Sequence, residues 1–243
     1  MGLTIHYTLA APPETDAVRA REIVMQLRRV AQGFKRRHRV DAVHPLGDDA
    51  AALRWATDYK DVPHPYKNGK RSGIEIPAKE GFLFPVEVGE DCEPLWLGLC
   101  RYPKTVVMGG RLYRTDQRGW RLSRCSKTQY ASLHGWEHFR RCHTAVIDLL
   151  LAAQRRGLVV KISDEGDYWP GRNVAALRRN IDEMNGVVAA AAGALKDFDE
   201  AINGTSNVAS PIFAHRNFER LEAEGATRAG PALSKLRAAI HNT

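Results

Sequence analysis

The sequence predicts an α+β protein in which a mixed β-sheet packs against three main helices, followed by a C-terminal helical appendage. Three observations indicate this class. Short apolar segments alternate with polar residues in the first two thirds of the chain, which is typical of strands. Longer segments carry apolar residues three and four positions apart, which is typical of helices. A helix followed at once by an apolar strand, over 137–162, is typical of mixed sheets.

The first strand is predicted over residues 3–9 and the first helix over 16–32. Apolar side chains stand at positions 3, 5, 7 and 9 of the strand, and Thr4, His6 and Thr8 alternate with them. Thr15 or Asp16 supplies the N-cap of the helix, whose apolar residues share one face. If helices cover one side of the sheet, the polar residues of this strand line an open face, as in RNA-binding α+β sandwiches.

Residues 57–80 are rich in proline, glycine, lysine and aspartate, and we expect a mobile loop or an insertion there. The segments that follow are predicted to be strands because they are apolar and bounded by glycine or proline. Their ranges are 82–88, 95–102, 105–108, 111–115 and 120–124. Gly109 and Gly110 separate two of them and predict a two-residue hairpin.

The second and third helices are predicted over 137–156 and 173–202, with Gly157 ending the former. Apolar residues of the 174–202 segment recur over four heptads, which predicts a seam packed on a partner, inside the chain or in a homo-oligomer. A polar linker begins after Asn203. Short helices are then expected after Ser210-Pro211 and after Gly230-Pro231. The sequence therefore predicts an α+β domain over 1–202 and a helical segment over 203–243.

The net charge of +8 is concentrated in one part of the chain. Residues 101–127 carry eight lysines and arginines against one acid, Asp116, with Tyr102, Tyr113 and Trp120 between them. Guanidinium groups pair with phosphates and aromatic rings stack on bases, so this composition suits a nucleic acid or a nucleotide. The predicted contact residues are Arg101, Arg111, Arg114, Arg118, Arg121, Arg124 and Lys127. The alternative is a set of solvated strands whose arginines pair with acids elsewhere.

An acidic turn follows the strand expected at 158–162. Asp164, Glu165 and Asp167 lie there, and ligand sites gather beyond strand ends in mixed sheets. The three carboxylates could bind Mg²⁺ or Mn²⁺ or act as general acid and base, and Trp169 could stack on a base. The alternative is a solvated turn that places acids at the N-terminus of the next helix.

Cys125 is a candidate nucleophile because Arg124 and Lys127 flank it, and nearby cations favour a thiolate. His134, His138 or His143 would then act as its base. The alternative is a thiol without a catalytic role.

His134, Glu137 and His138 match the H-x-x-E-H order of a group of zinc peptidases. The match requires both histidines on one helix, and Gly135 argues against this because a helix that begins after it leaves His134 outside.

The expected location is the cytoplasm. The four cysteines are far apart, which fits reduced thiols, and the N-terminal segment lacks the basic region of a signal peptide. The longest uncharged apolar stretch, 184–195, is shorter than the ~20 residues of a membrane span. We therefore expect no membrane partner.

Five strings of the chain resemble strings of an uncharacterised bacterial protein family. In chain order they are GLTIHYTL, GLCRYP, CSKTQYA, HFRRCH and SDEGDYW. The resemblance spans about residues 1–200 and leaves out the C-terminal appendage. It implies no activity, cofactor or catalytic residue.

The function that the sequence favours is the binding, with processing as a further step, of a nucleic acid or a nucleotide. Two other functions stay open. One is a hydrolase that depends on Cys125 and a histidine or on zinc, and the other is a non-enzymatic assembly subunit that uses the 174–202 helix.

Overall fold

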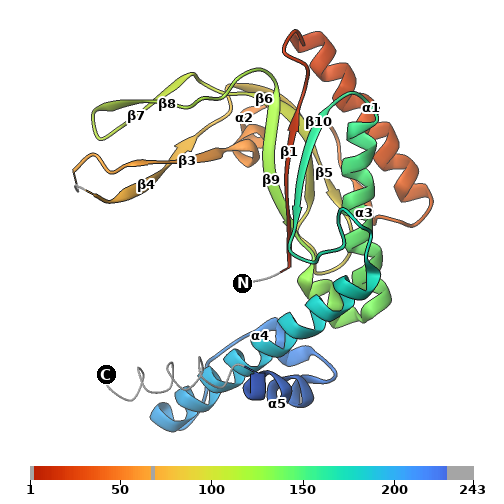
Figure 1. Cartoon of the computed structure of the whole chain (residues 1–243), viewed down its shortest axis with the longest axis vertical. Coiled ribbons are helices and arrows are strands. Elements are labelled where there is room, and N and C mark those ends of the chain that lie inside the picture. Colours follow the sequence, from red (N-terminus) through yellow and green to blue (C-terminus); the bar gives the residue numbers. More distant parts are fainter. Residues whose placement is uncertain (1–2, 67–68, 229–243) are drawn as a thin grey trace. The chain divides into compact units, whose positions relative to one another are not determined.

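The computed structural model describes residues 3–66 and 69–228, and its α+β architecture confirms the predicted class (Figure 1). Six strands form an antiparallel sheet in the order β10-β1-β9-β6-β5-β2. They are β1 (Thr4–Ala10), β2 (Ala42–Val43), β5 (Glu80–Glu87), β6 (Leu95–Arg101), β9 (Arg121–Lys127) and β10 (Val159–Asp164). The sequence suggested a mixed sheet because a helix joins β9 to β10. The sheet is antiparallel because β1 lies between these two strands.

The three long helices of the described chain begin and end within four residues of the predicted positions, and two shorter helices accompany them. They are α1 (Ala17–Arg36), α2 (Ala50–Leu53), α3 (Trp136–Gln154), α4 (Val174–Asn203) and α5 (Phe218–Arg228), with short 3₁₀ turns η1 (Arg54–Ala56), η2 (Gln129–His134) and η3 (Pro211–Ala214). The Asp16 carboxylate caps α1 by accepting a hydrogen bond from Arg19 N at 2.7 Å. Asn173 caps α4 in the same way, accepting from Ala176 N at 2.9 Å.

The chain divides into two compact units, which are described separately. The sheet unit comprises Ile5–Ser126 and Arg141–Ser163, and the helical unit comprises Met1–Thr4, Lys127–Arg140 and Asp164–Thr243. This division differs from the predicted boundary at residue 202. It groups α4 with the segments that follow it because α4 and α5 pack closely on each other.

The core of the sheet unit lies between the sheet and its helices. Helix α1 contacts β5 and β6, and α1 and α3 lie on the same side of the sheet (Figure 1). Along β1, Ile5, Tyr7 and Leu9 are buried, whereas His6 is exposed and Thr8 is half-buried. The alternation predicted for this strand is confirmed from Ile5 to Leu9, whereas Thr4, which was expected on the open face, is buried.

Two β-hairpins extend from the sheet unit side by side (Figure 1). One consists of β3 (Asp58–Pro63) and β4 (Arg71–Ile76), the other of β7 (Thr105–Met108) and β8 (Arg111–Arg114). The first hairpin corrects the prediction of a loop at 57–80, since its strands pair over their full length and bury Val62, Ile74 and Ile76.

The second hairpin was predicted from Gly109-Gly110. Both glycines have positive φ, +54° and +74°, which a two-residue turn of this kind requires.

Hydrogen bonds join the two hairpins. The Tyr66 hydroxyl donates to Gly109 O at 2.9 Å, and the Tyr113 hydroxyl donates to Pro63 O at 3.1 Å. Lys60 Nζ donates to Arg114 O at 2.8 Å and forms an ion pair with Asp116. These contacts fix the positions of the two hairpins relative to each other.

The helical unit is built on close contact between α4 and α5. Gly225 of α5 lies against Gly186 and Ala190 of α4, so the strip of small residues on α4 receives a helix of the same chain. Assembly of copies through α4 stays a prediction, and Val174, Leu195 and Ile202 of this helix are exposed. The helix expected after Gly230-Pro231 lies outside the described residues.

Two observations bear on the expected location. The cysteines are free thiols. Over residues 3–66 and 69–228, none of the helices combines the length and the apolar character that crossing a bilayer requires. The cytoplasmic location stays a prediction.

Candidate functional site

The arginine-rich segment surrounds a hollow of about 730 Å³ in the sheet unit, which we call the basic hollow. Four cations line it: Arg101, Lys104, Arg114 and Arg118. They come from the end of β6, the connection to β7, the end of β8 and the loop before β9. The chain leaves the sheet at β6, forms the β7–β8 hairpin and returns at β9, so cations 17 residues apart in sequence face one space.

Backbone contacts at the base of the hairpin hold these positions. Thr115 N donates to Lys104 O at 3.0 Å, and the Thr115 hydroxyl donates to Pro103 O at 2.5 Å. Because Thr115 is buried, these hydrogen bonds hold together the two connections that join the β7–β8 hairpin to the sheet.

The acids near the basic hollow are already paired. The ion pair with Lys60 neutralises Asp116, and the hydrogen bond from Lys60 holds the pKa of Asp116 below its ordinary value. Glu80 lies 3.0 Å from Arg101, whose guanidinium also lies over the Trp120 ring at 5.9 Å. Arg114 and Arg118 are exposed, and neither forms an ion pair within the described part of the chain. The hollow therefore keeps a positive surplus.

Gln117 also lines the basic hollow, and only the nitrogen of its side-chain amide has a hydrogen-bond partner in the described chain. Its Nε2 donates to Asp58 Oδ2 at 2.7 Å. Its Oε1 is buried and accepts no hydrogen bond from residues 3–66 or 69–228. A buried acceptor in this state favours a ligand or water that donates to it.

A second hollow, of about 510 Å³, lies over β10, β1 and β9 in the sheet unit, and we call it the open-face hollow. Its walls include His6 and Thr8 of β1, Ser123, Arg124 and Cys125 of β9, Lys161 and Ser163 of β10, and Asp58 and Tyr59 of β3. The Thr8 and Ser123 hydroxyls are 3.0 Å apart, which fixes how the two strands pair. The lining combines the cations Arg124 and Lys161 and several hydroxyl groups with apolar surface.

Arg121 and Arg124 belong to this part of the sheet. Arg121 Nη2 donates to the Ser123 hydroxyl at 3.2 Å. The Nε atoms of both arginines are buried, and the described residues supply neither with an acceptor. Such donors favour an acceptor such as a phosphate or carbonyl oxygen.

The three histidines that the sequence predicted as bases for Cys125 do not line its hollow. His143 of α3 is fully buried in the core, and His134 and His138 belong to the helical unit. The histidine that lines the same hollow as Cys125 is His6. Since Thr8 lies beside Ser123 in antiparallel strands, His6 comes beside Cys125 two residues away, a signal that only the strand pairing provides.

The acidic turn lies in the helical unit, and its carboxylates accept hydrogen bonds from within that unit. Asp164 accepts hydrogen bonds from the backbone N–H groups of Gly166, Tyr168 and Trp169, at 2.8 to 3.0 Å. Glu165 accepts from Thr4 N at 2.9 Å, and Asp167 accepts from Asn180 Nδ2 at 3.0 Å. These contacts fit the alternative that the sequence left open, a structural turn before α4, better than a metal or acid–base centre.

The H-x-x-E-H segment is interrupted at Gly135, whose φ is +96°. His134 ends η2 and His138 lies in α3, with ring centroids 5.1 Å apart, while Glu137 pairs with Arg140. Across residues 3–66 and 69–228, no group of three or more His, Cys, Asp or Glu is placed to hold a metal ion. The structure therefore gives the zinc hypothesis no third ligand.

The predicted contact residues thus fall into separate groups. Arg101, Arg114 and Arg118 line the basic hollow, Arg124 lines the open-face hollow, and Arg121 lies beside it. Arg111 begins β8 beyond the turn of the hairpin. Lys127 and Trp169 belong to the helical unit. Sequence reasoning missed Gln117, Asp58, Tyr59 and Lys161 as lining residues, because no local pattern marks them.

Comparison of the chain with protein-family models, with curated proteins and with solved structures finds no match.

Proposed function

We propose that the sheet unit binds a nucleic acid or a nucleotide through the basic hollow. The observation that carries this proposal is the gathering of Arg101, Lys104, Arg114 and Arg118 around one space whose acid, Asp116, is neutralised by Lys60. Arginine forks bind phosphate oxygens in pairs, and lysine adds a mobile point charge.

The size and lining of the hollow support the same ligand class. Its volume of about 730 Å³ lies within the usual range of ligand sites, about 300–1,000 Å³. Leu112 and the buried Tyr102 add apolar surface beside the cations. A ligand with both anionic groups and a flat apolar face, such as a nucleotide, complements this combination.

The test is binding of a fluorescein-labelled single-stranded oligonucleotide, followed by fluorescence anisotropy at fixed salt. The double variant Arg114→Ala/Arg118→Ala is expected to weaken binding roughly tenfold or more, since each of the two arginines contributes electrostatic attraction to a phosphate. The matched control is Arg19→Ala/Arg178→Ala, which removes two exposed arginines that pair within their own helices and line neither hollow. Equal losses of affinity in both double variants, or none in the first, would show that the basic hollow is not the site.

A second candidate function has one observation in its favour, the shared hollow of Cys125 and His6. In a thiol hydrolase, His6 would take the Cys125 proton and the thiolate would attack a carbonyl carbon. Alkylation of Cys125 by iodoacetamide, followed by mass spectrometry between about pH 5 and 9, tests this pairing. An activated thiol reacts well below its ordinary pKa and slows in His6→Gln; an ordinary thiol titration that His6→Gln leaves unchanged rejects it.

A further inference from the structure

We propose that the ligand is a single-stranded nucleic acid that occupies both hollows, with phosphates in the basic hollow and an unpaired base against Tyr59. The inference rests on the proposed function, because it adds a second contact region to the same site. It excludes two simpler ligands, a free mononucleotide and a duplex.

The two hollows are joined through one hydrogen bond. Asp58 lines the open-face hollow and Gln117 lines the basic hollow, and Gln117 Nε2 donates to Asp58 Oδ2 at 2.7 Å. The backbone N–H of Tyr59 donates to the other oxygen of Asp58 at 2.9 Å. The linings of the two hollows therefore meet at Gln117 and Asp58, next to Tyr59.

Tyr59 offers a face for stacking. Its side chain is 62% exposed although it lines the open-face hollow, so its ring stands at the rim. A base stacked on an aromatic ring contributes about 1–3 kcal/mol and needs no particular sequence. Only an unpaired base has a free face, since a duplex covers both faces of every base in its stack.

The rest of the open-face hollow suits the continuing chain of a nucleic acid. Arg124 and Lys161 supply cations, and Thr8, Ser123 and Ser163 supply hydroxyl groups that can donate or accept. The buried Nε of Arg124 and the buried Oε1 of Gln117 have no partner in the described chain, one a donor and one an acceptor. A strand that runs between the hollows brings acceptors and donors to both.

Because cations line both hollows, a ligand long enough to occupy both is favoured over a mononucleotide. The basic hollow measures about 730 Å³ and the open-face hollow about 510 Å³, and each lies within the range of about 300–1,000 Å³ of a separate small-ligand site. A mononucleotide fills one of them and leaves the other unused. A continuous strand that is bound in one hollow can enter the second without a further loss of translational and rotational entropy.

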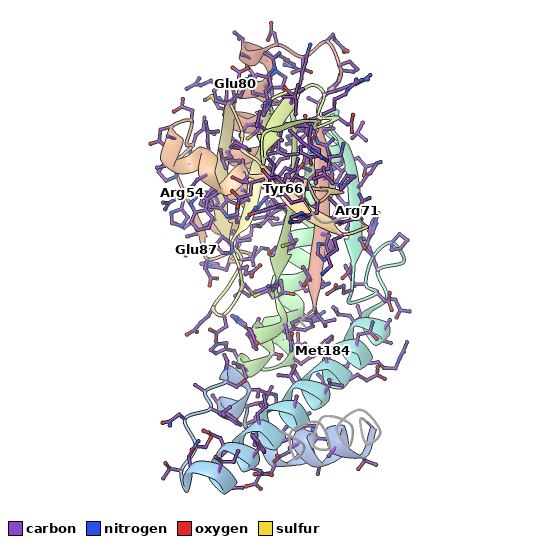
Figure 2. All side chains as sticks on the ribbon, turned by 90° about the vertical axis from the view of Figure 1, so that its left-hand side faces the viewer. Arg54, Tyr66, Arg71, Glu80, Glu87 and Met184 are labelled. Carbon is purple, nitrogen blue, oxygen red and sulfur yellow. The ribbon has the colours of Figure 1, made fainter. Side chains whose placement is uncertain are left out.

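Figure 2 shows the hairpin that carries Tyr59 from its tip, with Tyr66 and Arg71 labelled. Val107 is 69% exposed and lines neither hollow, which makes it a positional control for Tyr59 that leaves the hydrogen bonds between the hairpins in place. Tyr59→Phe keeps the ring and serves as the conservative variant. Tyr59 and Val107 are both exposed, so truncation of either side chain leaves the core intact.

The experiment compares four probes by anisotropy or competition: a ribonucleoside monophosphate, a single-stranded RNA and a single-stranded DNA of about 12 nucleotides, and the matching RNA duplex. We expect at least one single strand to bind tenfold or more tightly than the monophosphate and the duplex. Tyr59→Ala is expected to weaken single-strand binding about fivefold or more and to leave monophosphate binding unchanged, whereas Tyr59→Phe and Val107→Ala bind as the wild type does.

The outcomes separate this inference from the function on which it rests. If the monophosphate or the duplex binds as tightly as both single strands, or if Tyr59→Ala has no effect, the inference is wrong while Arg114→Ala/Arg118→Ala still reports on the basic hollow. If no probe binds at all, the proposed function and the inference both fall.

Discussion

Gln117 Nε2 donates a hydrogen bond of 2.7 Å to the Asp58 carboxylate, and this bond ties the start of β3 to the loop before β9. The two residues are 59 positions apart, and each lines a different hollow. The same carboxylate accepts the backbone N–H of Tyr59, so Asp58 is hydrogen-bonded to one lining residue of each hollow.

Gln117→Ala is expected to lower the free energy of unfolding by about 1 kcal/mol, because it removes a partly buried hydrogen bond to a carboxylate. Single-strand binding should weaken more than monophosphate binding, since the variant removes the hydrogen bond that links the linings of the two hollows. Urea denaturation and anisotropy measure the two effects. Gln26→Ala, at an exposed helical position, is the control and should change stability by less than about 0.5 kcal/mol. Equal changes in both variants would show that the Gln117–Asp58 hydrogen bond does not stabilise the fold.

Asp116→Asn is expected to strengthen oligonucleotide binding about two- to fivefold at low salt, because it removes a negative charge from the lining of the basic hollow and releases Lys60. Lys60→Ala should act in the opposite direction by leaving Asp116 unpaired. Anisotropy at low salt measures both. Glu14→Gln removes an exposed acid that lines neither hollow and should raise affinity less; a similar gain from both substitutions would indicate a general charge effect.

Gly225→Ala is expected to destabilise the helical unit by about 1–3 kcal/mol, because a Cβ at this position would overlap the backbone oxygen of Gly186. Gly186→Ala is the matched control. Its Cβ would meet Gly225 Cα at 3.6 Å, an ordinary contact, and alanine is the better helix former. Thermal unfolding should separate the two variants, and equal stability would contradict the close packing of α4 and α5.

Cys100 gives a prediction for alkaline pH. Burial raises the pKa of Cys100 to about 12, so the unfolded chain releases this proton above its ordinary value near 9 while the folded chain retains it. The stability from the buried thiol is therefore complete below about pH 9 and is lost as the pH rises towards 12. From about pH 8 to 10.5 the wild type should lose about 2 kcal/mol more than Cys100→Ala, measured by urea denaturation. Parallel pH profiles would contradict this account.

The fold was predictable wherever burial follows a local period. The alternation of β1 and the three-and-four spacing of α3 and α4 predicted those elements, and Gly109-Gly110 predicted a hairpin. The β3–β4 hairpin escaped prediction because its partners are other segments: Val62, Ile74 and Ile76 are buried in a stretch whose composition is that of a loop. The unit boundary escaped for the same reason, since neither helix by itself indicates that α5 packs on Gly186.

The sequence predicted which segment carries the cations, but not which of their side chains line one hollow. Charge counting located the cations of 101–127, but which of them share a hollow depends on where the chain reverses at Lys104 and Thr115. Strand pairing replaced the predicted histidines with His6 in the hollow of Cys125. The acidic turn looked like a ligand site because its carboxylates are close in sequence, yet the oxygens of Asp164 accept from three backbone N–H groups.

The salt dependence of single-strand binding tests the central claim most directly. If the four cations of the basic hollow contact phosphates, the logarithm of the association constant should fall with the logarithm of salt concentration with a slope of about −3. In Arg114→Ala/Arg118→Ala the slope should become shallower by about 1.4, which is about 0.7 for each cation removed. A slope near zero in the wild type, or one that the double variant leaves unchanged, would contradict the claim that this hollow binds a nucleic acid.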